Sequence, residues 1–200
     1  MPRAWSDREK GLIRDAMRSE GLKLFEKFGL RKTTVDEISK AARISKGAFY
    51  FFYQSKEELF FDIMESLESK YKGEIYGSII PPGRFTREGF KNFFRKLIAI
   101  LVEVPIFKGI NPEDYEYLKR KIPEETLNRH IDRDFGEMET LFSSWMEQGF
   151  IRTIDIKALS GVLLSLFYLS MHREDIGAID FSASEELIID MLSGYLVIGE

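Results

Sequence analysis

Residues 33–60 of the chain read TTVDEISKAARISKGAFYFFYQSKEELF, and potential helix caps divide this stretch into short helical segments. Thr34 can cap a helix while Glu37, three residues later, reaches back to it, which is the spacing of a capping box. Ser45 can cap the next helix in the same way that serine caps many helices. The connection at residues 43–44 leaves room only for a tight turn. Two short helices joined in this way predict a helix-turn-helix.

Apolar residues with helical spacing continue on both sides of this stretch. Upstream, residues 6–28 form one helical segment, and Gly29 stands where a helix end favours a left-handed backbone. Downstream, Ser55 and Glu58 form a second capping box that opens a long helix toward Lys72. The sequence Pro-Pro-Gly at 81–83 breaks this helical region. Further helices are predicted at 86–103, 112–121, 124–148, 155–173 and 183–198, with a loop at 174–182.

No period-two pattern typical of a strand occurs, so the sequence predicts an all-α fold. We expect a small N-terminal helical domain at 1–54, a connecting helix at 55–80 and a larger helical bundle at 81–200.

Charged side chains are distributed unevenly along the chain. The net charge of the 200 residues is −4, which by itself argues against a nucleic-acid partner. Residues 1–60, however, hold 13 basic and 9 acidic side chains, whereas residues 61–200 hold 16 and 24. This asymmetry indicates a basic binding module followed by an acidic body.

Composition excludes several classes of protein. The chain has no cysteine, which excludes a disulfide scaffold, a cysteine-ligated zinc module and a thiol nucleophile. The polar N-terminus predicts no signal peptide, and the longest uncharged run, at 158–171, is shorter than the roughly 18–20 residues that span a bilayer. We therefore expect a cytoplasmic protein with no membrane partner.

Motifs for catalysis, metal binding or cofactor binding are not found. His130 and His172 are far apart, and Gly73 and Gly77 match neither a Walker loop nor a dinucleotide-binding loop. No serine occupies a nucleophile elbow. The sequence therefore predicts no catalytic residue, no metal site and no cofactor.

The second helix of the predicted helix-turn-helix carries groups suited to DNA. Its first turn, at Ser45, Lys46 and Gly47, offers free N–H groups to a phosphate, and glycine allows the backbone to approach. The spacing of Phe49, Phe52 and Tyr53 places them on one inward face. The residues left to face outward are Lys46, Ala48, Tyr50 and Phe51, and Lys56 opens the next helix close by.

Matching residues extend through this whole region. They are Ile13, Ala16, Leu24, Phe25, Gly29, Thr33, Thr34, Asp36, Glu37, Ile38, Ala42, Ile44 to Tyr50, and Ser55 to Leu59. In this order they resemble the DNA-binding domain of the tetracycline-repressor (TetR) family of bacterial transcriptional regulators. The resemblance covers residues 10–60 and implies a double-stranded DNA operator as partner.

The resemblance also implies roles for single residues. Thr33 or Thr34 would contact a phosphate at the start of the first helix of the motif. The DNA backbone would be contacted by Lys46, Tyr50 and Lys56, and base edges by Ala48 and Phe51. 

Two departures from the family pattern bear on specificity. Arg43 stands where the family usually has a turn glycine, so either the turn avoids a positive φ or it carries a strain of about 1 kcal/mol. Arg43 is equally compatible with a phosphate contact and with an idle surface charge. Phe52 and Tyr53 stand where the family usually has a His/Tyr-Phe pair, so the recognition helix has one polar group fewer than usual. This difference favours thymine methyl contacts and DNA shape as sources of specificity.

The last two predicted helices are apolar on nearly all sides, and such helices need cover on both faces. A homodimer provides that cover, and the family resemblance implies the same pairing. The predicted pairing residues are Leu159, Val162, Leu163, Leu166, Ile188, Leu192, Tyr195 and Leu196. A single, well-buried core helix is the alternative for residues 155–173.

Between the two ends of the chain lie many aromatic residues, in the region where the family encloses a small molecule. The predicted pocket residues are Phe90, Phe94, Leu97, Phe107, Tyr115, Phe135, Phe142, Trp145 and Phe167. Ligand cavities are mostly apolar, but so are protein cores. If these residues line a pocket, its ligand is a small apolar or amphipathic molecule.

These observations predict a dimeric DNA-binding regulator, a repressor that binds a palindromic operator and is released by an apolar effector. One alternative is a helical small-molecule carrier or sensor that does not bind DNA. A second is an all-α enzyme, for which the sequence offers no candidate site.

Overall fold

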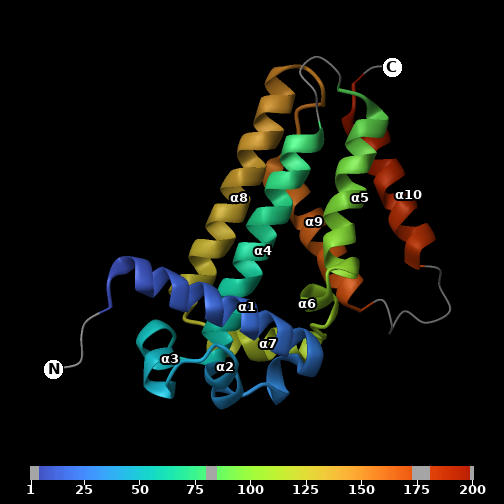
Figure 1. The fold of residues 1–200 in the computed structure, drawn as a ribbon. Helices are drawn as coiled ribbons and strands as arrows, with labels where there is room; N and C mark the ends of the chain where they lie inside the picture. Colours follow the sequence, from blue (N-terminus) through green and yellow to red (C-terminus); the bar gives the residue numbers. More distant parts are fainter. Residues whose placement is uncertain (1–4, 80–84, 173–180, 199–200) are drawn as a thin grey trace. The chain divides into compact units, whose positions relative to one another are not determined.

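The computed structural model describes residues 5–79, 85–172 and 181–198 (Figure 1). Within these ranges the chain is helical apart from short connections, and no strand occurs. One isolated antiparallel bridge pairs Ile151 with Val197. The predicted all-α fold is confirmed.

Ten helices lie in the described ranges, and the chain forms two compact units. The first unit, Met1–Ser69 with Gly109–Pro123, contains α1 (Asp7–Lys32), α2 (Val35–Ala41), α3 (Lys46–Phe52), the start of α4 (Lys56–Ile79) and α7 (Pro112–Lys121). The second unit, Lys70–Lys108 with Glu124–Glu200, contains the end of α4, α5 (Arg87–Glu103), α6 (Pro105–Lys108), α8 (Glu124–Glu147), α9 (Ile156–Met171) and α10 (Phe181–Leu196). No helix in the described part of the chain combines the length and apolarity needed to cross a membrane.

The observed helix boundaries lie within a few residues of most predicted ones. The short helix α6 was not predicted. The break predicted at 81–83 and most of the loop at 174–182 lie outside the described residues. The predicted domains 1–54, 55–80 and 81–200 divide the chain by function, and that division stays a prediction.

Both ends of α1 follow from local chemistry. Ser6 caps the helix and forms a capping box with Glu9, in which the Ser6 hydroxyl accepts from the Glu9 N–H at 3.3 Å. Gly29 adopts φ +78°, as the sequence predicted, and it interrupts the helix one turn before Lys32. A residue with a Cβ would be strained at this φ.

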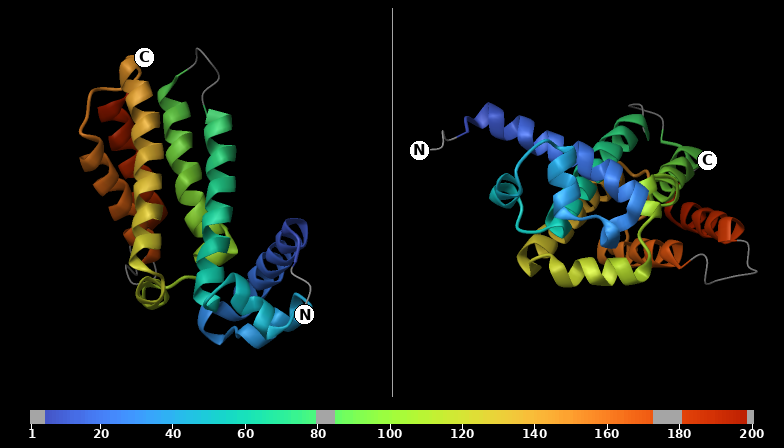
Figure 2. Two further views of the ribbon diagram at one scale, coloured as in Figure 1. Left: turned by 90° about the vertical axis from the view of Figure 1, so that its left-hand side faces the viewer. Right: turned by 60° about the horizontal axis from the view of Figure 1, so that its bottom comes forward.

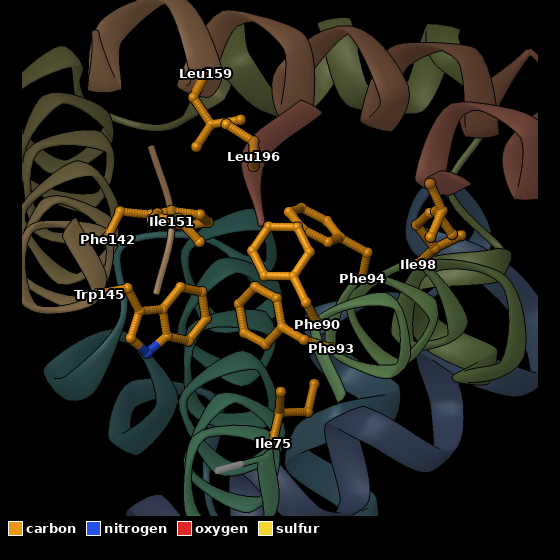
Figure 3. Packing of buried hydrophobic residues seen from close by; sticks show 11 residues of the cluster. Ile75, Phe90, Phe93, Phe94, Ile98, Phe142, Trp145, Ile151, Leu159 and Leu196 are labelled. Atoms are coloured by element: carbon orange, nitrogen blue, oxygen red, sulfur yellow. The ribbon is translucent and has the colours of Figure 1, made fainter. Parts of the chain in front are cut away.

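The core of the second unit is built from aromatic rings. Helix α5 packs against both α9 and α10, and α8 packs on α9 (Figure 2). Phe90 and Phe93 on α5 meet Trp145 on α8 with ring centroids 5.8 and 5.4 Å apart (Figure 3). Phe142 lies 5.0 Å from Trp145, in an edge-to-face arrangement. Aromatic pairs of this kind contribute about 0.5–1.5 kcal/mol each beyond the burial of their area.

A row of polar contacts fixes α10 against α5. Arg95 on α5 forms a double hydrogen bond with Glu186 on α10, and Lys91 forms an ion pair with Asp190. One turn further, the Arg87 Nε donates to the Ser193 hydroxyl at 3.3 Å. Because Arg87, Lys91 and Arg95 lie four residues apart, they share one side of α5, and their contacts determine which side of α10 faces α5.

Candidate nucleic-acid interface

Capping side chains define the starts of α2 and α3. The Thr34 hydroxyl accepts from the Glu37 N–H at 3.2 Å, and Glu37 Oε2 accepts from the Thr34 N–H at 2.9 Å. The Ser45 hydroxyl accepts from the Ala48 N–H at 3.1 Å. Both predicted caps are confirmed, and α2 packs against α1 and α3 (Figure 1). Thr34 and Ser45 are exposed, which leaves them accessible to a phosphate.

The turn between the two helices is closed by two backbone hydrogen bonds. The Arg43 N–H donates to Lys40 O at 3.2 Å, and the Ile44 N–H donates to Ser39 O at 2.9 Å. This is the pattern of a Schellman motif, which places its first residue beyond the helix cap in the left-handed region. Arg43 occupies that position with φ +56°, so the strained alternative is the one observed. Its side chain is exposed.

Helix α3 buries one side and exposes the other. Phe49 is fully buried and Ala48 is 5% exposed, whereas Tyr50 is 51% exposed and Phe51 is 62% exposed. The prediction that Ala48 faces outward toward base edges is wrong, because its methyl group packs inside the unit. The outward face of α3 therefore presents two aromatic rings from consecutive residues.

The first turn of α3 adds a cation to this face. Lys46 and Gly47 are both exposed. The Lys46 Nζ lies 2.9 Å from Asp36 Oδ1 on α2, and this contact raises the pKa of Lys46. The ammonium group therefore remains charged while it joins the two helices. At Gly47 an added Cβ would meet only the Ser45 hydroxyl, at 3.9 Å, so nothing inside the unit requires glycine there.

One carboxylate ties α3 to α1 and α4. Asp62 on α4 accepts hydrogen bonds from Arg18 Nε at 2.7 Å, from a second Arg18 nitrogen at 2.6 Å, and from the Tyr53 hydroxyl at 2.5 Å. Burial acts to raise the pKa of Asp62, but the hydrogen bonds from Arg18 and Tyr53 outweigh it and hold the pKa below its usual value. Because Tyr53 is the C-cap residue of α3, this carboxylate fixes the end of the exposed helix.

Lys56 and Thr33 stabilise the end of α1 instead of facing solvent. The Lys56 Nζ donates to the carbonyl oxygens of Leu30, Arg31 and Thr33 at 2.8, 2.9 and 2.7 Å. Thr33 is fully buried, and its hydroxyl donates to Gly29 O at 2.9 Å. An ammonium group has three protons, and all three of Lys56 are used here. The predicted phosphate contacts of Thr33 and Lys56 do not fit this arrangement.

The expected capping box at the start of α4 is only half formed. The Glu58 N–H donates to the Ser55 hydroxyl at 3.2 Å, as predicted. The Glu58 carboxylate, however, accepts from the Gln54 N–H at 2.6 Å. Helix α4 still begins at Lys56, directly after Ser55.

Trp5 lies beside the exposed face of α3, which the sequence analysis missed. Its indole stacks on Phe52 with centroids 5.7 Å apart and meets Phe51 edge to face at 5.3 Å. The Arg14 guanidinium lies 5.6 Å from the Phe52 ring centroid. Phe52 is consequently half-buried. No sequence pattern links residue 5 to residues 51 and 52, so only the fold could bring these rings together.

Comparison of the sequence with known proteins agrees with the helix-turn-helix seen in the structure. The sequence pattern of the family described as "Bacterial regulatory proteins, tetR family" matches residues 18–63. The HTH-type transcriptional regulator YuxN of Bacillus subtilis is 32% identical over 134 residues, which cover 63% of this chain and 44% of YuxN. Residues 18–63 therefore carry the pattern of the TetR family, and the chain is similar to transcriptional regulators of that family.

Further similarities extend beyond the helix-turn-helix. The HTH-type transcriptional regulator QacR of Staphylococcus aureus is 25% identical over 150 residues, which cover 75% of this chain and 79% of QacR. The crystal structure of a TetR-family transcriptional regulator from Pectobacterium atrosepticum has the same fold, with a TM-score of 0.72 at 18% identity over 98% of this chain and 100% of the other. The match to YuxN spans less than half of that protein's length.

Helix α7 lies in the same unit as the helix-turn-helix. Arg31 Nε donates to Asp114 Oδ1 at 2.6 Å, and the Arg31 guanidinium lies 4.9 Å from the Tyr117 ring centroid. The Tyr117 hydroxyl donates to Glu57 Oε1 at 2.8 Å, and Glu57 is 6% exposed. Helix α7 therefore braces the end of α1 and the start of α4.

The structure divides the predicted pocket residues among several places. The rings of Phe90, Phe94, Phe142 and Trp145 pack against one another in the core of the second unit, as the core alternative states. The side chains of Leu97, Phe107 and Phe135 are half-buried in the same unit. Tyr115 lies on α7 in the first unit. The side chain of Phe167 lies outside the described residues.

The predicted pairing residues divide in the same way. Leu159, Leu166 and Leu196 are buried in the core of their own unit, so they cannot form an outer face. Val162 and Tyr195 are exposed, and Leu163, Ile188 and Leu192 are half-buried. The exposed large apolar residues are Val162, Leu164, Tyr168 and Leu169 on α9, Leu187, Met191 and Tyr195 on α10, and Ile198 just after α10. Sequence alone gave the two helices but not which side of each is exposed.

The hydrogen bonds to Asp62 predict a specific loss of stability. Replacing Tyr53 with Phe removes one hydrogen bond to a partly buried carboxylate and should lower the free energy of unfolding by about 1–2 kcal/mol. Tyr50→Phe, which changes an exposed ring, should alter it by less than about 0.5 kcal/mol. Urea denaturation of the full chain measures both values, and equal effects of the two variants would contradict the assignment.

The same carboxylate predicts a dependence on pH. Its pKa is lowered by folding, so its contribution is present above the pKa of the unfolded chain, near 4, and is lost as the pH falls through the lower folded value. In Asp62→Asn this part of the acid-induced destabilisation should disappear. An unchanged acid profile in that variant would show that Asp62 does not carry it.

Proposed function

We propose that this chain is a homodimeric repressor that binds a palindromic DNA operator through α3 and is released by a small apolar or amphipathic effector. The observation that carries the proposal is the outward face of α3, where Lys46, Tyr50 and Phe51 are exposed while Ala48 and Phe49 are buried. A helix held in this way presents side chains to the major groove, with the preceding helix bracing it against the DNA backbone.

The charges near α3 support a DNA partner. Lys46 and Arg43 are both exposed, and Arg14 is exposed on α1. Cations at these positions suit phosphate oxygens, which supply affinity but not sequence specificity. The proposed interface keeps the predicted contacts Thr34 and Ser45, which are exposed, and leaves out Thr33 and Lys56.

The exposed face of α9 and α10 supports a dimer. Seven large apolar side chains on the described parts of these two helices are exposed in the single chain, and Ile198, just after α10, is exposed as well. Leu187, Met191 and Tyr195 recur every four residues on α10, on a different side from the residues that bind α5. An apolar surface of this kind is typical of a protein–protein contact, and a second copy buries it by two-fold symmetry. Two-fold symmetry in turn matches a palindromic operator.

The composition of the second unit supports an apolar effector. Its core consists of apolar side chains, and five of the eleven residues in the core cluster are aromatic: Phe90, Phe93, Phe94, Phe142 and Trp145. A ligand that separates such rings must offer apolar surface in exchange, because a charged or phosphorylated group would be buried without a partner. Binding that favours a different arrangement of the dimer would reduce the fit of its two recognition helices to one operator.

DNA binding by α3 predicts a particular dependence on salt. Fluorescence anisotropy with duplex DNA from upstream of the chain's own gene should show affinity that falls steeply as salt rises. Lys46→Met should weaken binding and reduce the salt slope by about one unit per chain, since one phosphate contact is lost. Lys23→Met is a matched control, because Lys23 is exposed on α1 and pairs with Glu20. Wild-type chain that does not bind duplex DNA in a salt-dependent manner would contradict the proposal.

The dimer is tested by placing a charge on the exposed apolar face. Met191 is 65% exposed in the single chain, so Met191→Glu should leave folding intact and dissociate the dimer at micromolar concentration. Ile131→Glu makes the same change at an exposed residue of α8 and should leave the dimer unchanged. Sedimentation equilibrium measures both, and a dimeric Met191→Glu variant would exclude this face as the interface.

The effector is tested by native mass spectrometry of the purified dimer. The spectrum should contain a mass above that of two 23.3 kDa chains, and the released compound should be apolar or amphipathic. Adding that compound should lower DNA affinity in the anisotropy assay. A retained phosphorylated molecule that lowers DNA affinity would contradict the proposed effector class.

A further inference from the structure

Trp5 is held in place by the start of α1. The Ser6 N–H donates to Glu9 Oε2 at 2.7 Å, and the Ser6 hydroxyl caps the helix. The backbone directly after Trp5 is therefore fixed relative to α1, which packs on α2 within the same unit. Trp5 is half-buried, so its indole is an ordered part of the unit's surface.

The Trp5 indole contacts Phe51, which is the most exposed aromatic residue of α3. Phe51 is 62% exposed, and it meets Trp5 at 5.3 Å and Phe52 at 5.1 Å, both edge to face. The Phe51 ring is thus flanked by two other rings although most of its surface faces solvent. Flanking rings restrict its rotamers before any partner binds, which reduces the conformational entropy lost on binding.

The chemistry of this surface selects one feature of DNA. A phenyl ring has no hydrogen-bond donor or acceptor, so it gains little from a phosphate or from the polar edge of a base. The apolar group that the major groove offers is the C5-methyl group of thymine. Tyr50, the neighbouring exposed ring, carries a hydroxyl and is suited to the DNA backbone.

We infer that Trp5 is a positioning residue for sequence recognition: it holds Phe51 in the orientation that contacts thymine methyl groups in each half-site. This inference rests on the proposed binding of DNA by α3 and adds a specificity-determining residue from outside the helix-turn-helix. Trp5 acts through Phe51, and Arg14 supports the same cluster through Phe52.

The test compares thymine with deoxyuridine, which lacks only the methyl group. The full-length chain first selects a duplex from a random library, and single thymines of that duplex are then replaced symmetrically in both half-sites. At one or two positions per half-site, wild type should lose about 4-fold in affinity per methyl group removed. Phe51→Ala and Trp5→Ala should lose this discrimination, with ratios below about 1.5, whereas Trp5→Phe should retain part of it.

Leu12→Ala is the matched control, because Leu12 is also an exposed apolar residue of α1. It should discriminate between thymine and deoxyuridine as wild type does. A Trp5→Ala variant that binds and still discriminates as wild type does would overturn the inference while leaving DNA binding by α3 intact. Wild type that does not bind any duplex would overturn both.

A second measurement decides the matter if Trp5→Ala does not bind at all. The chain has two tryptophans, Trp5 and Trp145, so 5-fluorotryptophan labelling gives two ¹⁹F resonances, and the one absent from Trp5→Phe belongs to Trp5. The Trp5 resonance should shift when the selected duplex is added, and it should shift differently when deoxyuridine occupies the sensitive position. A Trp5 resonance that responds identically to both duplexes would overturn the inference.

Discussion

The Asp62 carboxylate accepts hydrogen bonds from Arg18 on α1 and from Tyr53 at the end of α3, and it belongs to α4. Three helices of the N-terminal unit therefore meet at one charged group. Helix α3 has only seven residues and could not keep its orientation through its own hydrogen bonds. Its exposed face has a defined direction because both ends are fixed, one by Asp62 and the other by the Schellman turn that strains Arg43.

Two of the polar residues predicted to contact DNA are instead hydrogen-bonded within the N-terminal unit. Fewer polar groups are therefore available on its surface for DNA. Lys56 binds three carbonyl groups at the end of α1, where the end of the helix at Lys32 leaves carbonyl groups without helical partners. Buried Thr33 donates a hydrogen bond to Gly29 O in the same region. The surface proposed to face DNA then consists of a few exposed groups, mainly Lys46, Tyr50 and Phe51, with Trp5 beside them. Such a surface has few hydrogen-bonding groups for base edges, which gives apolar contacts a larger share of the specificity.

Local patterns allowed much of this structure to be predicted from sequence. Thr34 and Ser45 cap their helices as expected, because capping depends on residues three positions apart. The burial of Ala48 was missed, since the register of a seven-residue helix is set by packing against α1 and α2. The contact of Trp5 with Phe51 joins distant parts of the chain and leaves no periodic signal. Helices α9 and α10 are apolar on most sides, so the sequence could not show that Leu166 faces inward and Met191 outward.

The central claim is that DNA binds on the outward face of α3, beside Trp5 and the start of α1. Amide hydrogen exchange of the full chain, with and without the selected duplex, tests it directly. The account predicts that the duplex slows exchange in peptides covering residues 43–52 and the first turn of α1, and leaves α7 and the aromatic core of the second unit unchanged. Protection confined to other helices, with residues 43–52 exchanging at the same rate in both states, would contradict it.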